Sequence, residues 1–330
     1  MELILSAKVK NKLKSLRRPS PSFRLFTVVC IVLLLLSACK RPQDALGNGQ
    51  SRAFTFTDDD DNIVKLNEPY RRIISLYSVH TENLFAIGAG AYLIGVQSSA
   101  AYPPEADLLP KYTYSGDPEH VIAANPDLVL IRPFIRRQNP GYINELEMAG
   151  IAVVSLYPEQ FDDFDAYIRR LAALSGREAE AEEKLSAFHN KLASISAQAS
   201  NIEHKRTVFF ESTEHELRTV AAESLPAKAI EFAGGINIAA GAKALRPGSS
   251  IAPFGVEKIL EHADEIDVYI VQQGAMNQTK NIAEFSARPG FGALKALREG
   301  HVFFIDEKII SSPTFRYLDG LREMAQILLP

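Results

Sequence analysis

The chain has 330 residues, which is enough for about two domains, each with a core of its own. Its composition, 46% hydrophobic and 23% charged, is typical of a globular protein and excludes a disordered, collagen-like or coiled-coil chain. With two cysteines it is also not a disulfide-stapled miniprotein. The net charge of −4 gives no sign of a surface that neutralises phosphates, so we expect no nucleic-acid partner.

The N-terminus has the features of an export signal. Seven basic residues and one acidic residue precede an apolar run from Leu25 to Leu36, which is short for a bilayer-spanning helix of about 20 residues. The run ends in Leu36-Ser37-Ala38-Cys39, which resembles a bacterial lipobox, whose cysteine is acylated before cleavage. We therefore expect a lipoprotein signal peptide over residues 1–38 and lipidation at Cys39, with a plain signal anchor as the alternative. Cleavage would leave 292 residues with a net charge of −10.

Residues 39–53 lack any apolar period and predict a flexible tether between the lipid anchor and the folded part. Two short strand-like runs follow, over 53–57 and 63–66, and they flank four consecutive aspartates. We interpret the acidic run as the solvated turn of a hairpin. A calcium site is the alternative, but the spacing of an EF-hand loop is missing.

From Arg72 the pattern alternates between continuous apolar strands and short helices, which indicates a mostly parallel sheet covered on both faces. The expected strands are 73–76, 93–96, 127–131 and 151–156, and the expected helices are 81–87, 119–124 and 142–149. These elements predict an N-terminal α/β lobe over residues 54–160.

Apolar residues then recur at helical spacing for almost forty residues, interrupted at Ser175-Gly176. Strand–helix alternation resumes beyond this stretch. The expected strands are 207–211, 268–272 and 302–305, and the expected helices are 226–233, 257–263, 289–298 and 315–328. We predict two Rossmann-like α/β lobes with central, mostly parallel sheets, joined by a single long backbone helix within 161–200, the second lobe covering 201–330.

Five segments carry a resemblance to a known family. They are Arg72–Leu76, Thr81–Gly90, Leu93–Val96, Asn125–Leu130 and Gly234–Ala239. Their order and spacing resemble the helical-backbone (class III) substrate-binding lipoproteins of ABC importers, which serve ferric siderophores, haem, cobalamin and some oxyanions. The resemblance implies ligand capture in the cleft between the lobes, delivery to a permease dimer with its ATPase, a monomer on the periplasmic side of the membrane, no catalytic residue and no cofactor.

One acidic residue opens a short helix before a buried strand in each lobe: Glu119 in the first and Glu257 in the second. N-terminal helix capping alone explains either residue. In the family, one acidic residue on each lobe docks on arginines of the permease. The resemblance therefore implies that Glu119 and Glu257 are the docking residues.

Ligand contacts are expected at the carboxyl ends of strands, where they face the cleft. The candidate ligand-binding residues are Tyr77, His80, Tyr114, Arg132, Arg246 and Arg316. The three arginines would suit an anionic ligand, because guanidinium groups match carboxylate, phosphate and oxyanion geometry. We expect His80 to donate a hydrogen bond or cap its helix rather than bind metal, since no second histidine stands at ligand spacing.

A ferric siderophore is the first choice of ligand, with cobalamin, haem and a molybdate-like oxyanion as alternatives. The absence of tryptophan argues against a large aromatic platform for a corrinoid, although tyrosines could replace it. An α/β enzyme is the rival from another class. It is disfavoured because the turn after the first strand lacks the glycines of a dinucleotide site and no Gly-x-Ser-x-Gly occurs. A zinc or manganese carrier would need several His and acidic ligands from both lobes.

Overall fold

The computed structural model describes residues 54–246 and 248–329. The predicted signal peptide, the lipidation site Cys39 and the tether lie outside these residues. The described part begins with an antiparallel hairpin, β1 (Phe54–Thr57) and β2 (Ile63–Leu66), as the sequence predicted. Its acidic turn is held by protein groups: the buried Asp58 carboxylate accepts the backbone N–H of Asn62 and of Ser155.

The N-terminal lobe is built on a parallel five-stranded sheet in the order β5-β4-β3-β6-β7. The strands are β3 (Ile73–Ser75), β4 (Leu93–Gln97), β5 (Lys111–Tyr112), β6 (Leu128–Ile131) and β7 (Ala152–Ser155). The helices are α2 (Ser78–Ala86), α3 (Glu119–Ala123), α4 (Pro133–Gln138) and α5 (Pro140–Met148), with 3-10 turns η1 (Gly90–Tyr92) and η2 (Pro104–Leu108). Core side chains from α3, α4 and α5 cover one face of this sheet, and α2 covers the other.

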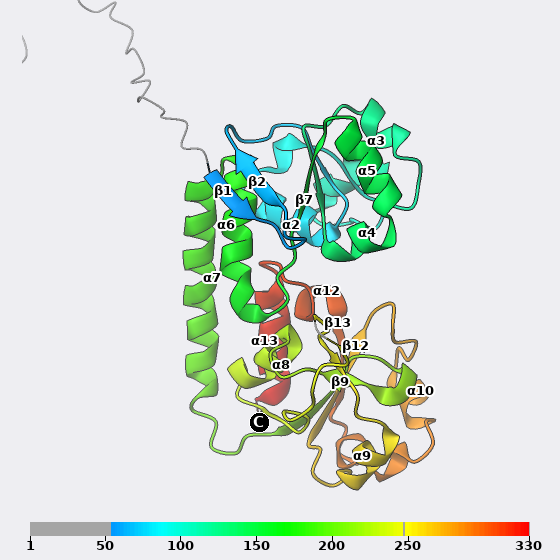
Figure 1. The fold of residues 1–330 in the computed structure, drawn as a ribbon. Helices are drawn as coiled ribbons and strands as arrows, with labels where there is room; N and C mark the ends of the chain where they lie inside the picture. The colour runs from blue at the N-terminus through cyan, green and yellow to red at the C-terminus, as the bar shows by residue number, and fades with distance from the viewer. Residues whose placement is uncertain (1–53, 247, 330) are drawn as a thin grey trace, which may run out of the picture. The chain divides into compact units, whose positions relative to one another are not determined.

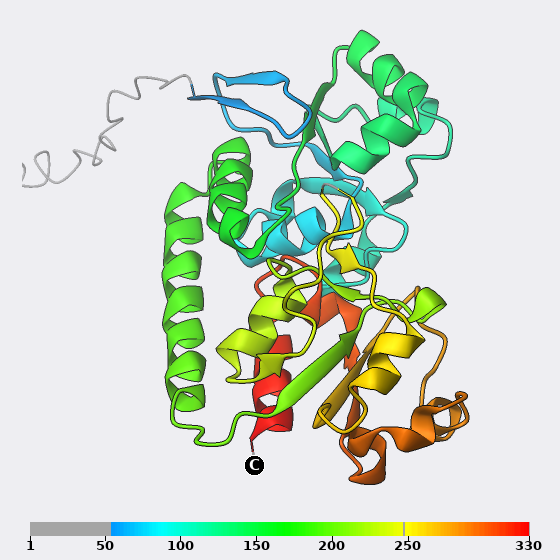
Figure 2. The ribbon, with the colours of Figure 1, turned by 60° about the horizontal axis from the view of Figure 1, so that its bottom comes forward.

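The connection between the lobes is two helices rather than one. After η3 (Phe161–Asp163), α6 (Phe164–Ser175) ends at Gly176, whose φ of 64° is the left-handed conformation that glycine adopts most easily. The long helix α7 (Glu178–Ala199) follows and packs beside α6, as both views show (Figures 1 and 2). The single backbone helix expected from the sequence is therefore α7 alone.

The C-terminal lobe is built on a parallel four-stranded sheet in the order β10-β8-β12-β13. Its strands are β8 (Thr207–Glu211), β10 (Ile236–Asn237), β12 (Val268–Gln273) and β13 (Val302–Asp306), and β9 (Thr219–Val220) pairs with β11 (Ile251–Ala252). Its helices are α8 (Leu225–Phe232), α9 (Val256–Glu261), α10 (Ile282–Ser286), α11 (Lys295–Arg298), α12 (Glu307–Ile310) and α13 (Tyr317–Leu328), with 3-10 turns η4 (His215–Leu217) and η5 (Phe291–Ala293). The α/β architecture with two parallel central sheets is confirmed.

The largest core cluster runs through both lobes. It joins Leu128 and Leu130 of β6 to Val208 and Phe210 of β8 through the helices α6, α7, α8 and α13. Figure 2 shows α13 between α7 and the second sheet. The opposite face of each sheet has a separate core, so the strands are mostly apolar, as expected for sheets covered on both sides, with polar residues such as Glu211 and Gln273 at their carboxyl ends.

Candidate functional site: an aromatic and cationic cluster between the lobes

An aromatic cluster surrounds Arg132 at the carboxyl end of the first sheet. Tyr77 follows β3, Arg132 follows β6 and Tyr157 follows β7, so the parallel order of these strands brings the three side chains to one edge. The Arg132 guanidinium lies 4.8 Å from the ring centroid of Tyr77 and 4.9 Å from that of Phe134. The Tyr77 and Tyr157 rings are 6.2 Å apart.

The charge of Arg132 is not compensated by an acid: no carboxylate of the described residues forms an ion pair with it. Burial raises the pKa of Tyr77 and of Tyr157 above the usual tyrosine value, although nearby Arg132 acts in the opposite direction. Both phenols are therefore neutral at physiological pH and can donate hydrogen bonds. The cluster offers aromatic faces and one cation, which suits a flat ligand that carries an anionic group.

His80 supports this cluster from within the core. Its ring is fully buried and meets the edge of the Tyr77 ring at 5.0 Å. The Nε2 atom lies 2.9 Å from the Ile131 carbonyl oxygen, and Nδ1 lies 2.7 Å from the Tyr167 hydroxyl. Burial lowers the pKa of His80 to about 4, so the ring is neutral. Because a carbonyl can only accept, Nε2 donates to Ile131 and Nδ1 accepts from Tyr167, which leaves no ring nitrogen for a ligand.

Arg316 was expected to be one of three cations around the cleft, and in the structure it is paired with an acid. Its Nε and Nη2 donate to the two carboxylate oxygens of Glu82 at 2.9 and 2.6 Å. Its guanidinium also stacks on the Tyr102 ring, 3.8 Å from the centroid. Glu82 belongs to α2 and Arg316 precedes α13, so the pair joins the two lobes. The structure therefore gives this arginine a bridging role.

The remaining two candidates do not reach the cluster. Tyr114 is half-buried and packs on the core face under α3, α4 and α5. Arg246 is exposed, and its carbonyl accepts the N–H of Ser249 in the loop before β11. Of the six candidate ligand residues, the structure thus brings together Tyr77, His80 and Arg132. The candidate residues did not include Phe134 and Tyr157, although Phe134 lies in the first turn of α4, directly after β6 and Arg132, and Tyr157 stands two residues after β7.

A small cavity of about 230 Å³ lies between the lobes. Ser78 and Ser99 line it from the first lobe, and Lys308 and Ser312 line it from the second. The residues of the aromatic cluster, Tyr77, Arg132, Phe134 and Tyr157, are not among the residues that line it. Its polar lining can bind the hydrogen-bonding groups of a ligand held between the lobes.

A buried ion pair holds the loops of the second lobe that follow β8 and β12. Arg288 donates to both oxygens of Glu211 at 2.6 and 2.9 Å, and Tyr269 donates to Glu211 at 2.6 Å. Glu214 accepts the backbone N–H groups of Gln278 and Thr279. Burial raises the pKa of Glu214, but these hydrogen bonds lower it more, so the pKa lies below the usual glutamate value. This network, which sequence reasoning missed, holds together the segments that follow β8 and β12.

Glu119 and Glu257 occupy the same place in both lobes. Each is exposed in the first turn of a short helix, α3 or α9. Neither carboxylate is paired with a cation of the described residues. Within the same residues, no group of three or more His, Cys, Asp or Glu side chains could hold a metal ion. Every described helix is too short or too polar to cross a membrane.

Comparison with known proteins identifies the family. Residues 73–309 match the model of the periplasmic binding protein family. A vitamin B12-binding protein of Vibrio parahaemolyticus is 29% identical over 268 residues, which are 80% of this chain and 92% of that protein. An uncharacterized ABC transporter substrate-binding lipoprotein of Bacillus subtilis is 22% identical over 316 residues, 93% of this chain and 96% of the relative.

Among solved structures, a possible iron-binding, periplasmic solute-binding protein from Staphylococcus epidermidis has the same fold. Its TM-score is 0.70 at 22% identity, and the match covers 80% of this chain and 100% of that one. The two lobes, the long helix between them and the family match agree with the class that the sequence resembled. The chain therefore belongs to the periplasmic binding protein family, whose members are extracytoplasmic solute-binding components of transport systems and not enzymes.

Proposed function

We propose that this protein captures a metal chelate with a flat face and an anionic group, a corrinoid in the first place, and delivers it to an ABC importer. The single observation that carries the proposal is Arg132, which has no acidic partner among the described residues and is flanked by the rings of Tyr77 and Phe134. A corrinoid presents a flat macrocycle and a phosphodiester. The rings can contact the first and the guanidinium can bind the second.

This order of ligands differs from the one that the sequence favoured. A corrinoid was ranked below a ferric siderophore because the chain has no tryptophan. Tyr77, Phe134 and Tyr157 together supply aromatic surface, and the Vibrio relative named as a vitamin B12-binding protein matches most of both chains. A ferric siderophore stays the second candidate, because an uncompensated arginine also suits an anionic iron chelate.

Titration of the purified protein separates these candidates. We expect cyanocobalamin to bind with at least micromolar affinity, measured by calorimetry and by its visible absorbance, and more tightly than ferric hydroxamate, haemin or molybdate. Tight binding of ferric hydroxamate without cyanocobalamin binding would select the second candidate. Failure of all four ligands would contradict the proposal.

The proposal includes attachment to the membrane through Cys39 and docking through Glu119 and Glu257. The lipobox-like segment supports the first, and the exposed carboxylates on α3 and α9, which pair with no cation in the described part of the chain, support the second. Two acyl chains and a thioether-linked glycerol would provide stable anchoring, since one chain alone binds a membrane only marginally. Replacing Cys39→Ser should release the protein from the membrane fraction and abolish incorporation of labelled palmitate, without changing ligand affinity.

A further inference from the structure

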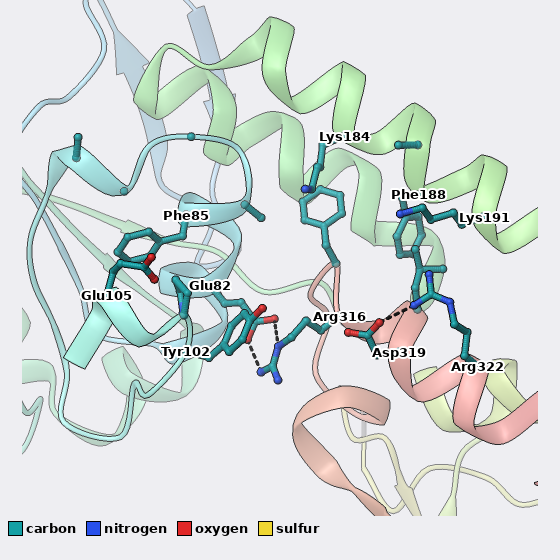
Figure 3. A pocket seen from close by; sticks show the side chains of 18 residues that line it. Glu82, Phe85, Tyr102, Glu105, Lys184, Phe188, Lys191, Arg316, Asp319 and Arg322 are labelled. Carbon is teal, nitrogen blue, oxygen red and sulfur yellow. Dashed lines mark hydrogen bonds and ion pairs between the residues drawn. The ribbon is translucent and has the colours of Figure 1, made fainter. Parts of the chain in front are cut away.

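A larger cavity of about 650 Å³ lies beside α7 (Figure 3). Its walls come from α2 and the Tyr102–Glu105 segment of the first lobe, from α7, and from the start of α13 in the second lobe. It shares Glu82, Tyr102 and Arg316 with the small cavity of the candidate site. The ion pair and the tyrosine ring therefore form a partition, and the larger cavity is a separate compartment.

The floor of this cavity is aromatic and firmly packed. Phe85, Phe188 and Phe315 line it, and only 2% of Phe188 is exposed. The Phe315 ring packs against Phe188 at 5.9 Å and against Phe164 at 5.3 Å, both in edge-to-face geometry. A side chain at position 90 would collide with the Phe85 ring, so the glycine leaves room for this ring in the cavity wall. The floor can cover an apolar group of a ligand without rearranging.

The rim of the cavity is cationic along α7. Lys184 and Lys191 are exposed, line the cavity and stand seven residues apart, so they lie on one helix face about 10 Å apart. Neither ammonium forms an ion pair with an acid in the part of the chain that the structure describes. The two arginines of the cavity are already neutralised, Arg316 by Glu82 and Arg322 by Asp319 at 2.6 Å.

Of the three acids that line the cavity, Glu82 and Asp319 are paired with Arg316 and Arg322, and the third, Glu105, lies away from these lysines. Figure 3 shows Glu105 next to Phe85, at the end opposite to Lys184 and Lys191. The Lys184 ammonium lies 6.0 Å from the Phe315 ring centroid, so cation and aromatic floor are adjacent. An organic anion could thus place its apolar body on the phenylalanines and its charged group at the lysines.

We propose that this cavity is a second binding site, for a carboxylate with an apolar aromatic or aliphatic body. Its volume lies within the range of about 300 to 1,000 Å³ that is usual for small-molecule sites, and apolar walls with a few placed charges are their usual lining. A charged group at exposed lysines keeps contact with water, while the apolar body leaves it. This inference does not depend on the ligand of the cleft.

The test uses 2-naphthoate as the probe and 2-naphthamide as its neutral counterpart. Because the protein has no tryptophan, naphthoate fluorescence can be measured without interference from the chain. We expect the wild-type protein to bind 2-naphthoate at least tenfold more tightly than 2-naphthamide at low salt, with the preference decreasing as salt screens the lysines. Equal affinities, or no binding of 2-naphthoate, would overturn the proposal.

Variants show whether 2-naphthoate binds in this cavity. Lys184→Met with Lys191→Met should weaken 2-naphthoate binding about tenfold, and Ala187→Phe, which fills the cavity from the same helix face without adding a tryptophan, should abolish it. Lys205→Met, at an exposed lysine outside the cavity, is the matched control and should change nothing. Unchanged 2-naphthoate affinity in both cavity variants would overturn the proposal. Cyanocobalamin titration of the same proteins is independent, so failure of the cleft ligand and failure of this site give different results.

Discussion

Glu82 of α2 and Arg316 before α13 are 234 residues apart in sequence and form a doubly hydrogen-bonded ion pair between the two lobes. Glu82 is only 8% exposed. Beside it, the Asn83 amide donates to the Pro313 carbonyl oxygen at 2.9 Å. The lobes are therefore joined at the partition between the two cavities as well as through α6 and α7. The ion pair and this hydrogen bond hold α2 of the first lobe against the segment before α13 of the second lobe.

Replacing Arg316→Met should destabilise the protein by about 2 to 4 kcal/mol, because it leaves the Glu82 carboxylate buried without a partner. Urea unfolding at pH 7 measures the loss. The double variant Glu82→Gln with Arg316→Met should recover most of it, since no buried charge remains. A single variant as stable as the wild type would show that the pair is not formed in solution.

The buried histidine predicts a loss of stability in mild acid. The pKa of His80 is about 4 in the folded protein, whereas an unfolded chain has the usual value near 6.5. Below pH 6.5 the unfolded state therefore binds a proton that the folded state does not bind, and stability falls as the pH falls from 6.5 to 4. The full effect of 2.5 pKa units is about 3 kcal/mol, of which about 2 kcal/mol is lost by pH 5.

Urea unfolding at pH 7 and pH 5 tests this titration. In His80→Gln, whose amide can still bond to Ile131 and Tyr167, the loss between the two pH values should be smaller by about 2 kcal/mol than in the wild type. His204 is exposed, and His204→Gln is the matched control that should retain the wild-type slope. An identical slope in His80→Gln would mean that another group causes the pH dependence.

The site was predicted best where its residues follow strands. Tyr77 and Arg132 come directly after two apolar runs, and neighbouring parallel strands place their carboxyl ends at one edge, so their meeting follows from the alternation itself. The sequence analysis predicts no helix over residues 132–137, although Pro133 in the first helical position begins α4. A helix of six residues is too short for a helical period of apolar residues to be recognised in the sequence.

Pairing between distant residues could not be predicted in the same way. Nothing near Arg316 indicates that an acid of α2 neutralises it, and nothing near Glu211 indicates Arg288, 77 residues later. The signal that was present is an acid inside an otherwise buried segment, as at Glu211 in β8, because a buried carboxylate needs a cation. Such an acid indicates that a partner exists but not which one, since the partner depends on the tertiary fold.

Removing Arg288, the cation of the pair with Glu211, should lower the free energy of unfolding more than removing Arg316 does. Arg288→Met leaves the fully buried Glu211 without its guanidinium, and we expect a loss of about 3 to 5 kcal/mol in urea unfolding. Glu211→Gln with Arg288→Met should be much closer to the wild type, with the Gln amide still able to bond to Tyr269. If the double variant is as unstable as the single one, lost packing of Arg288 on Phe285 and Phe291 is the cause instead.

Arg132 should control affinity and Arg246 should not. Arg132→Met is expected to weaken binding of the cleft ligand at least tenfold, because it removes the cation but retains a side chain that can pack on Tyr77 and Phe134. Arg132→Lys should be intermediate, since an ammonium keeps the charge without the planar fork. Calorimetry with cyanocobalamin measures these changes. Equal losses in Arg132→Met and the exposed Arg246→Met would contradict the assignment of the site to the aromatic cluster.

The acidic residues of α3 and α9 should act on delivery alone. Glu119→Lys and Glu257→Lys place a cation where the docking proposal needs an anion, and we expect each to reduce ligand uptake by cells at least tenfold while ligand affinity and stability stay at wild-type values. The two exposed side chains have no partner among the described residues, so folding should not change. Glu203→Lys, at an exposed acid outside both helices, is the matched control. A loss of affinity in either variant, or normal uptake in the double variant, would refute docking through these residues.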